Sequence, residues 1–403
     1  MTVSLETADA PVDEAWKKSS FNSVEIDLGA LADNYRLLAR HVAGRLMPVV
    51  KGDAYGHGLT ACARTLVEAG AADLGVLDVA EAERLRADGV QAELHILAGL
   101  HGPEQMDAAL KIRARTLIYS RGQLEALGAR ARALGLKAAG RLKVDTGMGR
   151  LGVPWPEAPA VIESLAEQSD VVVEGLATHL ATSGDVWADR QLERFAALAA
   201  LADRRLGRPL RHSALASGGL LTSDDGPGDL SRPGLLIYGV SPLAADDPAL
   251  AARPAARALV GALRPAMSFK SLVVQTRKVR AGETISYDRT FEAPADLTAA
   301  VAPAGYVHGL SRRRSSRGWG LIEGRRVPLL GRVCMNLTVW DVSGLDRPAD
   351  GQALVLLGRS GEAAVDAVEA AAWQDTNAYE LLCLLGRLNP RTYRPAPSST
   401  NPR

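Results

Sequence analysis

The 403-residue sequence has few cysteines, almost no net charge and no long apolar run. Cys62, Cys334 and Cys383 lie far apart and form no CxxC pair, which indicates neither a disulfide framework nor a zinc site. A formal net charge of +1 provides no bulk attraction for nucleic acid or an anionic membrane. No stretch reaches the roughly 18 apolar residues of a membrane span. We expect a cytoplasmic protein that acts on a small molecule, with no metal and no nucleic-acid or membrane partner.

From residue 24 to about residue 240, short apolar runs alternate with longer amphipathic stretches. This alternation predicts βα units and a parallel sheet. Eight strands, the number of a (β/α)8 TIM-type barrel, are expected at 46–50, 74–77, 94–97, 116–119, 141–144, 171–177, 211–216 and 235–238. Helices between them are expected at 79–88, 121–134 and 189–205.

The composition of the sequence changes after Tyr238. An Ala- and Pro-rich segment is followed there by runs of β-branched residues that are separated by glycine-containing breaks. Such runs predict strands rather than further βα units. The predicted fold class is therefore α/β, with an N-terminal barrel over 28–256 and a C-terminal, mainly β domain over 257–403. A strand from 21–27 is expected to join the β domain.

The segment LMPVVKGDAYGHG places Lys51 directly after an apolar strand. In a barrel this is the C-terminal face, where active sites of this architecture lie. Partial desolvation there would lower the pKa of the lysine and make its amine available for imine formation. Taken alone, such a lysine more often extends its ammonium group to solvent than serves a function.

Other candidate side chains follow later strands of the predicted barrel. Arg150 follows a glycine turn, and His179 stands at a strand end, where a histidine is often only structural. Barrels often bind phosphate between the loops after strands seven and eight. Ser217 and Gly234 lie in those loops, although ordinary turns would explain each loop equally well.

The segments together resemble the alanine racemases, a family of fold-type III pyridoxal-phosphate enzymes. The resemblance extends from about residue 24 to 394. It rests on segments in the family's order: VVKGDAYGHG, KVDTGMGRLG, THLAT, RPGLLIYG, ISYDRTF, GRVCMN and NAYELLCLLGRLNPR. The lysine with YGHG is characteristic of the family, whereas RPG alone would be weak.

The resemblance implies pyridoxal 5'-phosphate as cofactor, with Lys51 as the Schiff-base lysine and Tyr287 as the opposing base. In the family this tyrosine comes from the other subunit, which implies a homodimer. The implied activity is racemisation of L- and D-alanine by two bases, supplying D-alanine for peptidoglycan. Two bases suit racemisation because a proton must leave one face of the substrate and arrive on the other.

Further roles follow from the resemblance alone. Arg232 would face the pyridine nitrogen with His179 supporting it, and Arg150 would contact the cofactor's phenolic oxygen and the substrate carboxylate. The residues that would line the phosphate are Tyr55, Ser217, Gly234, Leu235 and Tyr379. Met335 would bind the substrate carboxylate through its N–H, and Tyr306 would narrow the pocket. Lys143 matches a lysine that many members carry as a carbamate.

Several positions depart from the family's pattern near the expected pocket. Asn336 and Ala216 replace the family's common Asp and Asn, Val307 and His308 replace Ala and Asp, and the entrance aspartate is shifted to Asp185. Neither proposed base is affected. These departures leave open a racemase of serine or a bulkier amino acid. A pyridoxal-phosphate-binding homologue with little racemase activity is a further alternative, against which the retained pair of bases argues.

Overall fold

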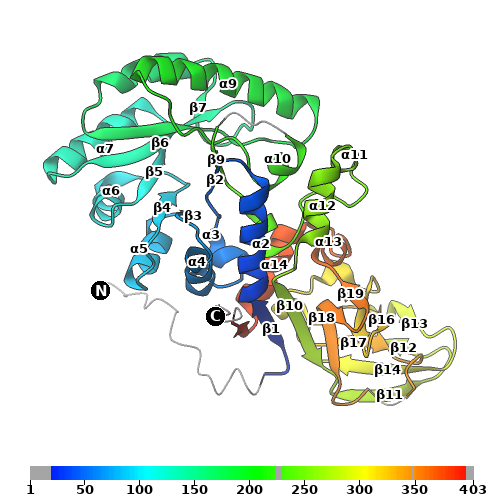
Figure 1. The fold of residues 1–403 in the computed structure, drawn as a ribbon. Coiled ribbons are helices and arrows are strands. Elements are labelled where there is room, and N and C mark those ends of the chain that lie inside the picture. Colours follow the sequence, from blue (N-terminus) through cyan, green and yellow to red (C-terminus); the bar gives the residue numbers. More distant parts are fainter. Residues whose placement is uncertain (1–19, 224–227, 347–348, 396–403) are drawn as a thin grey trace, which may run out of the picture. The chain divides into compact units, whose positions relative to one another are not determined.

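The computed structural model describes residues 20–223, 228–346 and 349–395. The chain divides into two compact units, which are coloured along the sequence in Figure 1. The barrel unit comprises Asp27–Ala266, and the β unit comprises Met267–Arg394 with the described residues up to Ile26. Within the described ranges, no helix combines the length and apolar character needed to cross a membrane.

The barrel unit contains a closed ring of parallel strands, as predicted. β3 to β6 pair in order, β8 pairs with β6, and β9 pairs with β2. Three isolated bridges close the ring and include the extended segment 211–216 in it. They pair Val49 with Gly75, Ala177 with Ser213, and Ala216 with Arg232. The strands are β2 (Arg45–Leu46), β3 (Asp73–Val76), β4 (Glu93–Ile96), β5 (Arg115–Ile118), β6 (Ala138–Asp145), β7 (Val153–Pro154), β8 (Val171–Ala177) and β9 (Leu230–Ser231).

Helices alternate with these strands, and polar side chains fix where several of them begin. Asp27, Asp78, Ser120 and Asp185 each accept a hydrogen bond from a backbone N–H of the first helical turn. The helices are α2 (Leu28–His41), α3 (Lys51–Tyr55), α4 (Leu59–Glu68), α5 (Val79–Ala87), α6 (Gly102–Lys111), α7 (Arg121–Ala133), α8 (Ala158–Ser164), η1 (Leu165–Glu167), α9 (Val186–Leu206), α10 (Ser217–Thr222), η2 (Leu235–Tyr238), α11 (Pro248–Ala251) and α12 (Pro254–Ala262).

The prediction of a strand at Leu235–Tyr238 is wrong. This segment is the 3-10 helix η2, and the eighth strand is β9, a few residues earlier. Ser217 Oγ accepts hydrogen bonds from the N–H groups of Gly234 and Leu236, which turns the chain out of the sheet. The run is nevertheless fully buried. A short buried helix and a buried strand have the same apolar pattern, so the sequence does not separate them.

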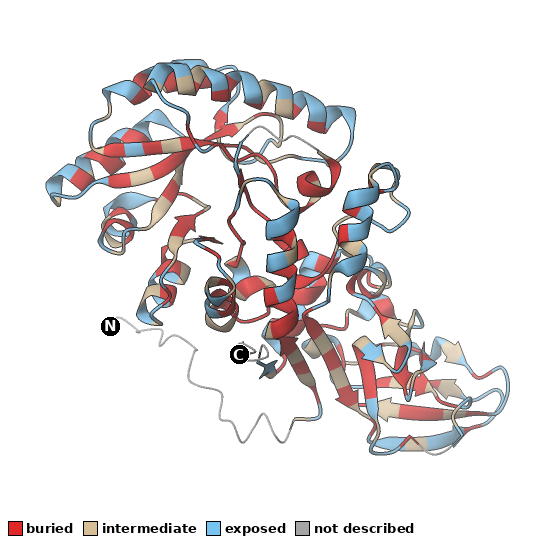
Figure 2. Cartoon of the chain, in the orientation of Figure 1, coloured by how far each residue is buried: buried red, intermediate tan, exposed pale blue. Residues whose placement is uncertain are grey.

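The core of the barrel unit consists of aliphatic side chains from the strands and the inner faces of the helices. Figure 2 colours buried residues red along the chain. Ala256 and Leu259 of α12 belong to this core. The structural division therefore falls after Ala266, beyond the boundary at 256 that the sequence indicates. The change in composition marks the start of a surface segment rather than the end of the packed unit.

The β unit is built on a long sheet with the order β11-β14-β17-β16-β15-β18-β10-β1-β20, and β19 pairs with β18. β1 (Ser23–Asp27) pairs antiparallel with β10, so the expected N-terminal strand belongs to this sheet. The other strands are β10 (Met267–Leu272), β11 (Gln275–Val279), β12 (Thr284–Ile285), β13 (Phe291–Glu292), β14 (Leu297–Ala302), β15 (Trp319–Ile322), β16 (Arg325–Leu330), β17 (Thr338–Asp341), β18 (Ala353–Ser360), β19 (Ala363–Val365) and β20 (Arg391–Arg394). Its helical segments are η3 (Tyr287–Arg289), η4 (Tyr306–His308), η5 (Arg312–Arg314), α13 (Ala367–Ala372) and α14 (Ala378–Leu388).

Candidate active site

Lys51 begins an unusual turn at the end of the first barrel strand. Gly52, Asp53, Ala54 and Tyr55 all have positive φ, between 54° and 64°. Three of these four residues carry a side chain and rarely adopt this left-handed conformation. Glu81 of α5 holds the turn, because its Oε1 accepts a hydrogen bond of 2.7 Å from Gly52 N. Strain concentrated directly after a strand end is typical of functional sites.

The loops after strands seven and eight approach each other closely, as the phosphate hypothesis requires. Ser217 is buried at the start of α10, and its Oγ lies 2.9 Å from Gly234 N. A Cβ at Gly234 would lie only 2.4 Å from the hydroxyl oxygen of Tyr55. Only glycine therefore leaves room for that hydroxyl beside the two loops. Hydroxyl groups and N–H groups together fit a phosphate dianion.

Arg232 follows β9 and is almost completely buried. It donates hydrogen bonds to Ser213 Oγ, to Thr178 O at 2.5 Å and to Ala214 O at 3.3 Å. Burial first, and then the like charge of Arg141, lowers its pKa to about 10. Arg232 therefore remains a guanidinium near neutral pH, fixed by acceptors on two neighbouring loops.

Four cationic side chains from three strand ends lie around His179. Burial is the main cause that lowers the pKa of His179 to about 3, followed by the positive charges of Arg232, Lys143, Arg150 and Lys51. The imidazole is therefore neutral at physiological pH. The structure thus brings these five barrel residues together at the carboxyl ends of the strands, although the first and the last lie more than 180 positions apart in the sequence.

Lys143 lies inside the barrel on β6, with its Nζ 3.2 Å from Val144 O. Burial first, and then the charge of Arg232, lowers its pKa to about 7. A large fraction of this amine is consequently uncharged at neutral pH, which makes it nucleophilic.

The loop that presents Arg150 is organised by Asp145 at the end of β6. Its carboxylate accepts hydrogen bonds from the backbone N–H groups of Gly147, Met148 and Arg150 at 2.9, 2.7 and 3.1 Å. These bonds lower the pKa of Asp145, although burial opposes them. Asp145 stays ionised and keeps the loop in one conformation.

The remaining predicted residues belong to the β unit. Tyr287 begins η3, and 62% of its surface is exposed. The residue before it, Ser286, has φ of 69° and donates a hydrogen bond of 2.8 Å to Arg332 O. Asp288 accepts from Arg312 and lies 3.4 Å from Arg332 Nε. Tyr287 is therefore presented to solvent from a loop that is fixed on both sides.

Met335 and Tyr306 lie next to the same segment. Tyr306 N donates to Cys334 O at 3.1 Å, and Val307 N donates to Met335 O at 3.2 Å. His308, which departs from the family's pattern, accepts a hydrogen bond from Gly305 N through Nδ1. This histidine therefore stabilises the loop that carries Tyr306. Met335, Tyr306 and Tyr379 are all partly exposed, and burial raises the pKa of Tyr379.

Sequence reasoning missed the residues that hold the candidate side chains in place. Glu81 and Asp145 are ordinary acidic residues in sequence, and nothing in their spacing indicates that they bind backbone N–H groups. The shifted aspartate, Asp185, is the N-cap of α9 and accepts from Ala188 N at 2.8 Å. Only the family's motif singled it out.

A closed parallel barrel with a lysine, three further cations and a neutral histidine at its strand ends defines an enzyme of the (β/α)8-barrel class. Family profiles make this specific: "Alanine racemase, N-terminal domain" matches residues 26–242, and "Alanine racemase, C-terminal domain" matches residues 266–393. The chain belongs to the alanine racemase family of isomerases, as its motifs predict.

Similar proteins cover nearly the whole chain. The alanine racemase of Nitratidesulfovibrio vulgaris is 38% identical over 92% of this chain and 98% of its own length. The crystal structure of alanine racemase from Streptomyces lavendulae superposes with a TM-score of 0.83 at 34% identity, covering 93% of this chain and 97% of that one. The Bartonella henselae enzyme, at 27% identity and a TM-score of 0.79 over 93% and 99%, contains covalently bound pyridoxal phosphate.

Proposed function

We propose that this protein interconverts L- and D-alanine with pyridoxal 5'-phosphate as its cofactor and with Lys51 and Tyr287 as the two bases. The observation that carries the proposal is the position of Lys51. It emerges from a strained turn at the carboxyl end of a barrel strand, among the cations that surround His179. A lysine in this position can form an imine, and positive charge around it suits an anionic cofactor and a carboxylate substrate.

The residues of the barrel unit fit this cofactor. When bound, pyridoxal phosphate supplies an electron sink for the pair left behind by the α-proton. Ser217, Tyr55 and the backbone at Gly234 and Leu235 would hold its phosphate. The close approach between Gly234 and the Tyr55 hydroxyl, which a Cβ would prevent, supports this assignment.

Arg232 would face the pyridine nitrogen. Its guanidinium stays charged at neutral pH because its pKa of about 10 lies well above that pH. An arginine in this position would leave that nitrogen unprotonated and so weaken the electron sink. We infer that this restrains side reactions such as transamination. His179 would support Arg232 as a neutral ring, which its lowered pKa permits.

The two bases divide the proton transfers between the faces of the substrate. The amine of Lys51 takes or gives the α-proton on one face, and the phenol oxygen of Tyr287 does so on the other. Tyrosine has an ordinary pKa of about 10, so it needs nearby positive charge to act near neutrality. Arg150 would bind the substrate carboxylate with the N–H of Met335, and Tyr306 would limit the size of the side chain.

Lys143 would carry a carbamate. The uncharged amine attacks carbon dioxide, a nitrogen–carbon bond forms, and a proton leaves to solvent. Its pKa of about 7 supports the reaction, because a lysine with an ordinary pKa is almost entirely protonated. The resulting negative charge would lie among Arg232 and Arg150, the cations that now lower the pKa of the amine.

Tyr287 would act in the site of a second copy of the chain, so we propose a homodimer. The exposed position of Tyr287 on a fixed loop suits a side chain that completes a partner's site. We further propose that the enzyme is cytoplasmic and supplies D-alanine for peptidoglycan.

The experiment is to incubate purified protein and cofactor with L-alanine and to follow the loss of optical rotation. Wild type should bring the rotation to zero, as a racemic mixture requires. Lys51→Ala and Tyr287→Phe should each lose at least about a hundredfold in rate, the usual contribution of a positioned base. Full activity in either variant would show that the two-base assignment is wrong.

A racemase of serine or a bulkier amino acid is the second candidate, favoured by the altered loop at Val307 and His308. His308 binds the backbone at Gly305 and so shapes the loop that carries Tyr306. Turnover of alanine, serine and larger amino acids by the same preparation separates the two candidates. A higher kcat/KM for serine than for alanine would favour the second.

A further inference from the structure

A separate hollow lies where the barrel strands begin, at the opposite strand ends from Lys51. Its volume is about 860 Å³, which is within the range of small-molecule sites. The segments that line it include those that start β4, β5 and β6. Five cations, Arg45, Arg86, Arg113, Arg115 and Lys137, line this hollow with a single carboxylate, Glu93. Neither Lys51 nor Tyr287 lines this hollow.

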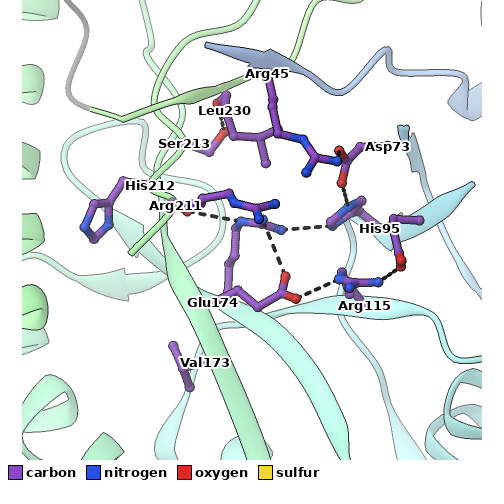
Figure 3. Close-up of polar contacts among 12 residues, drawn as sticks. Arg45, Asp73, His95, Arg115, Val173, Glu174, Arg211, His212, Ser213 and Leu230 are labelled. Atoms are coloured by element: carbon purple, nitrogen blue, oxygen red, sulfur yellow. Dashed lines mark hydrogen bonds and ion pairs between the residues drawn. The ribbon is translucent and has the colours of Figure 1, made fainter. Parts of the chain in front are cut away.

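Two of these cations are held by a chain of buried polar groups (Figure 3). Arg115 Nε donates to Glu174 at 2.8 Å, and at the other end Arg45 lies 2.5 Å from Asp73. Between them, Glu174 lies 3.5 Å from Arg141, which donates to His95 Nδ1 at 2.9 Å, and His95 Nε2 donates to Asp73 at 2.8 Å.

This chain fixes the orientation of Arg45 and Arg115 before any ligand arrives. Its central members, Asp73, His95 and Arg141, are each less than 5% exposed, so their contacts are not exchanged with water. Preorganised cations bind an anion more strongly than flexible ones, because less side-chain entropy is lost on binding.

Positive charge exceeds negative charge around the hollow. Three of the five lining cations, Arg45, Arg115 and Lys137, pair with carboxylates: Asp73, Glu93, Glu174 and Asp170. Glu174 is also shared with Arg141, and Asp170 with Arg132. Seven cationic groups therefore face four carboxylates. His95 adds no charge, because burial lowers its pKa and its Nδ1 accepts an N–H from Arg141.

Arg86 and Arg113 account for much of this excess. Among the described residues, Arg86 donates to two neutral carbonyl oxygens, Val90 O at 2.8 Å and Ile112 O at 3.3 Å. Its pKa is lowered by burial and then by the like charge of Arg115. Within the described part of the chain, the exposed guanidinium of Arg113 has neither a hydrogen bond nor an ion pair.

We propose that this hollow binds a small polyanion that carries at least two phosphate or carboxylate groups. Arg45, Arg86 and Arg115 supply fixed donors, and Arg113 and Lys137 at the exposed margin can close onto the ligand. Guanidinium groups suit such ligands because their parallel N–H groups bind two anionic oxygens at once. The proposal does not depend on the racemase reaction.

Isothermal titration of the cofactor-loaded protein with inorganic pyrophosphate tests the proposal. We expect one saturable site per chain in the wild type. Arg113→Glu should weaken binding at least tenfold, and Lys137→Gln should weaken it several-fold. Arg121→Glu is the matched control, because Arg121 is an exposed arginine on α7 that does not line the hollow. This variant should bind as wild type does.

Citrate serves as a second probe that carries carboxylates only. Binding of both probes with the same dependence on Arg113 supports a site selected by charge, and binding of pyrophosphate alone supports a phosphorylated ligand. The absence of saturable binding to the wild type would overturn the proposal. Equal affinity in wild type, Arg113→Glu and Lys137→Gln would also overturn it, since binding would then occur elsewhere, including the active site.

Discussion

Lys143 and His179 lie among the same cations, and burial moves the pKa of both in the same direction. For His179 the result is a ring that is neutral throughout the physiological range. For Lys143 the lowered pKa of about 7 places the change of charge within that range. The sequence identifies both residues through motifs, but their protonation depends on burial inside the barrel.

The stability of the protein should depend on pH through Lys143. Its pKa is about 7 in the folded chain and has the ordinary value of 10.5 when exposed. Between these values the unfolded chain binds more protons at this residue, so the free energy of unfolding should rise with pH from 7 to 10. Below pH 7 the residue should contribute no further change.

Urea unfolding of bicarbonate-free wild type and Lys143→Met at pH 7 and pH 9.5 measures this effect. Wild type should gain stability relative to Lys143→Met at the higher pH, by an amount on the order of 1 kcal/mol or more. An equal difference between the two proteins at both pH values would show that the amine has an ordinary pKa when folded.

At the scale of elements, two features position the candidate residues without touching the substrate. One is the left-handed turn after Lys51, which Glu81 holds through its bond to Gly52 N. The other is α9, where Arg194 Nη1 donates to Thr146 O at 2.9 Å. The guanidinium of Arg194 lies 4.7 Å from the ring centre of Trp155 and 5.4 Å from that of Trp187.

Glu81→Gln should loosen the turn that carries Lys51. One side-chain oxygen of Glu81 accepts a hydrogen bond from Gly52 N and the other from Leu77 N. A glutamine would place its NH2 group against one of these two N–H groups. We expect the dissociation constant of the cofactor to rise about tenfold, for a loss of about 1–2 kcal/mol. Titration followed by the absorbance of the bound cofactor measures it. Glu83→Gln, an exposed neighbour on α5, should have no effect; equal values in both variants would contradict the role of Glu81.

Arg194→Met should release the loop that presents Arg150. Because Arg150 is the proposed partner of the substrate carboxylate, KM for alanine should rise about tenfold while kcat changes less. The control is Arg190→Met, which alters an exposed arginine on the same helix. A lower melting temperature with an unchanged KM would mean that Arg194 serves stability alone.

Much of the barrel can be predicted from the sequence, because the spacing of apolar residues distinguishes strands from helices in seven of its eight units. The same pattern makes Lys51 a candidate, as a lysine at the end of an apolar strand, and the family's segments assign its proposed role. The sequence does not predict the left-handed turn, since Ala54 and Tyr55 rarely adopt positive φ. The strand order within the β unit does not follow from the sequence, because its long sheet joins strands that are distant in sequence, such as β10 and β18.

At the scale of the whole molecule, the proposed bases belong to different units of the chain. Lys51 lies in the barrel unit, and Tyr287 lies in the β unit on a loop fixed by Ser286 and Asp288. The family relationship supports a two-base racemase, and we propose that each site combines Lys51 of one copy with Tyr287 of another.

Mixing two inactive variants tests this claim most directly. Lys51→Ala and Tyr287→Phe chains are unfolded together, refolded with cofactor and assayed for loss of optical rotation of L-alanine. If sites are shared between copies, each mixed dimer contains one site with both residues intact. Random pairing should then restore about a quarter of wild-type activity, while each variant refolded alone stays inactive. No activity above that of the separate variants, in a mixture shown to contain mixed dimers, would contradict the account.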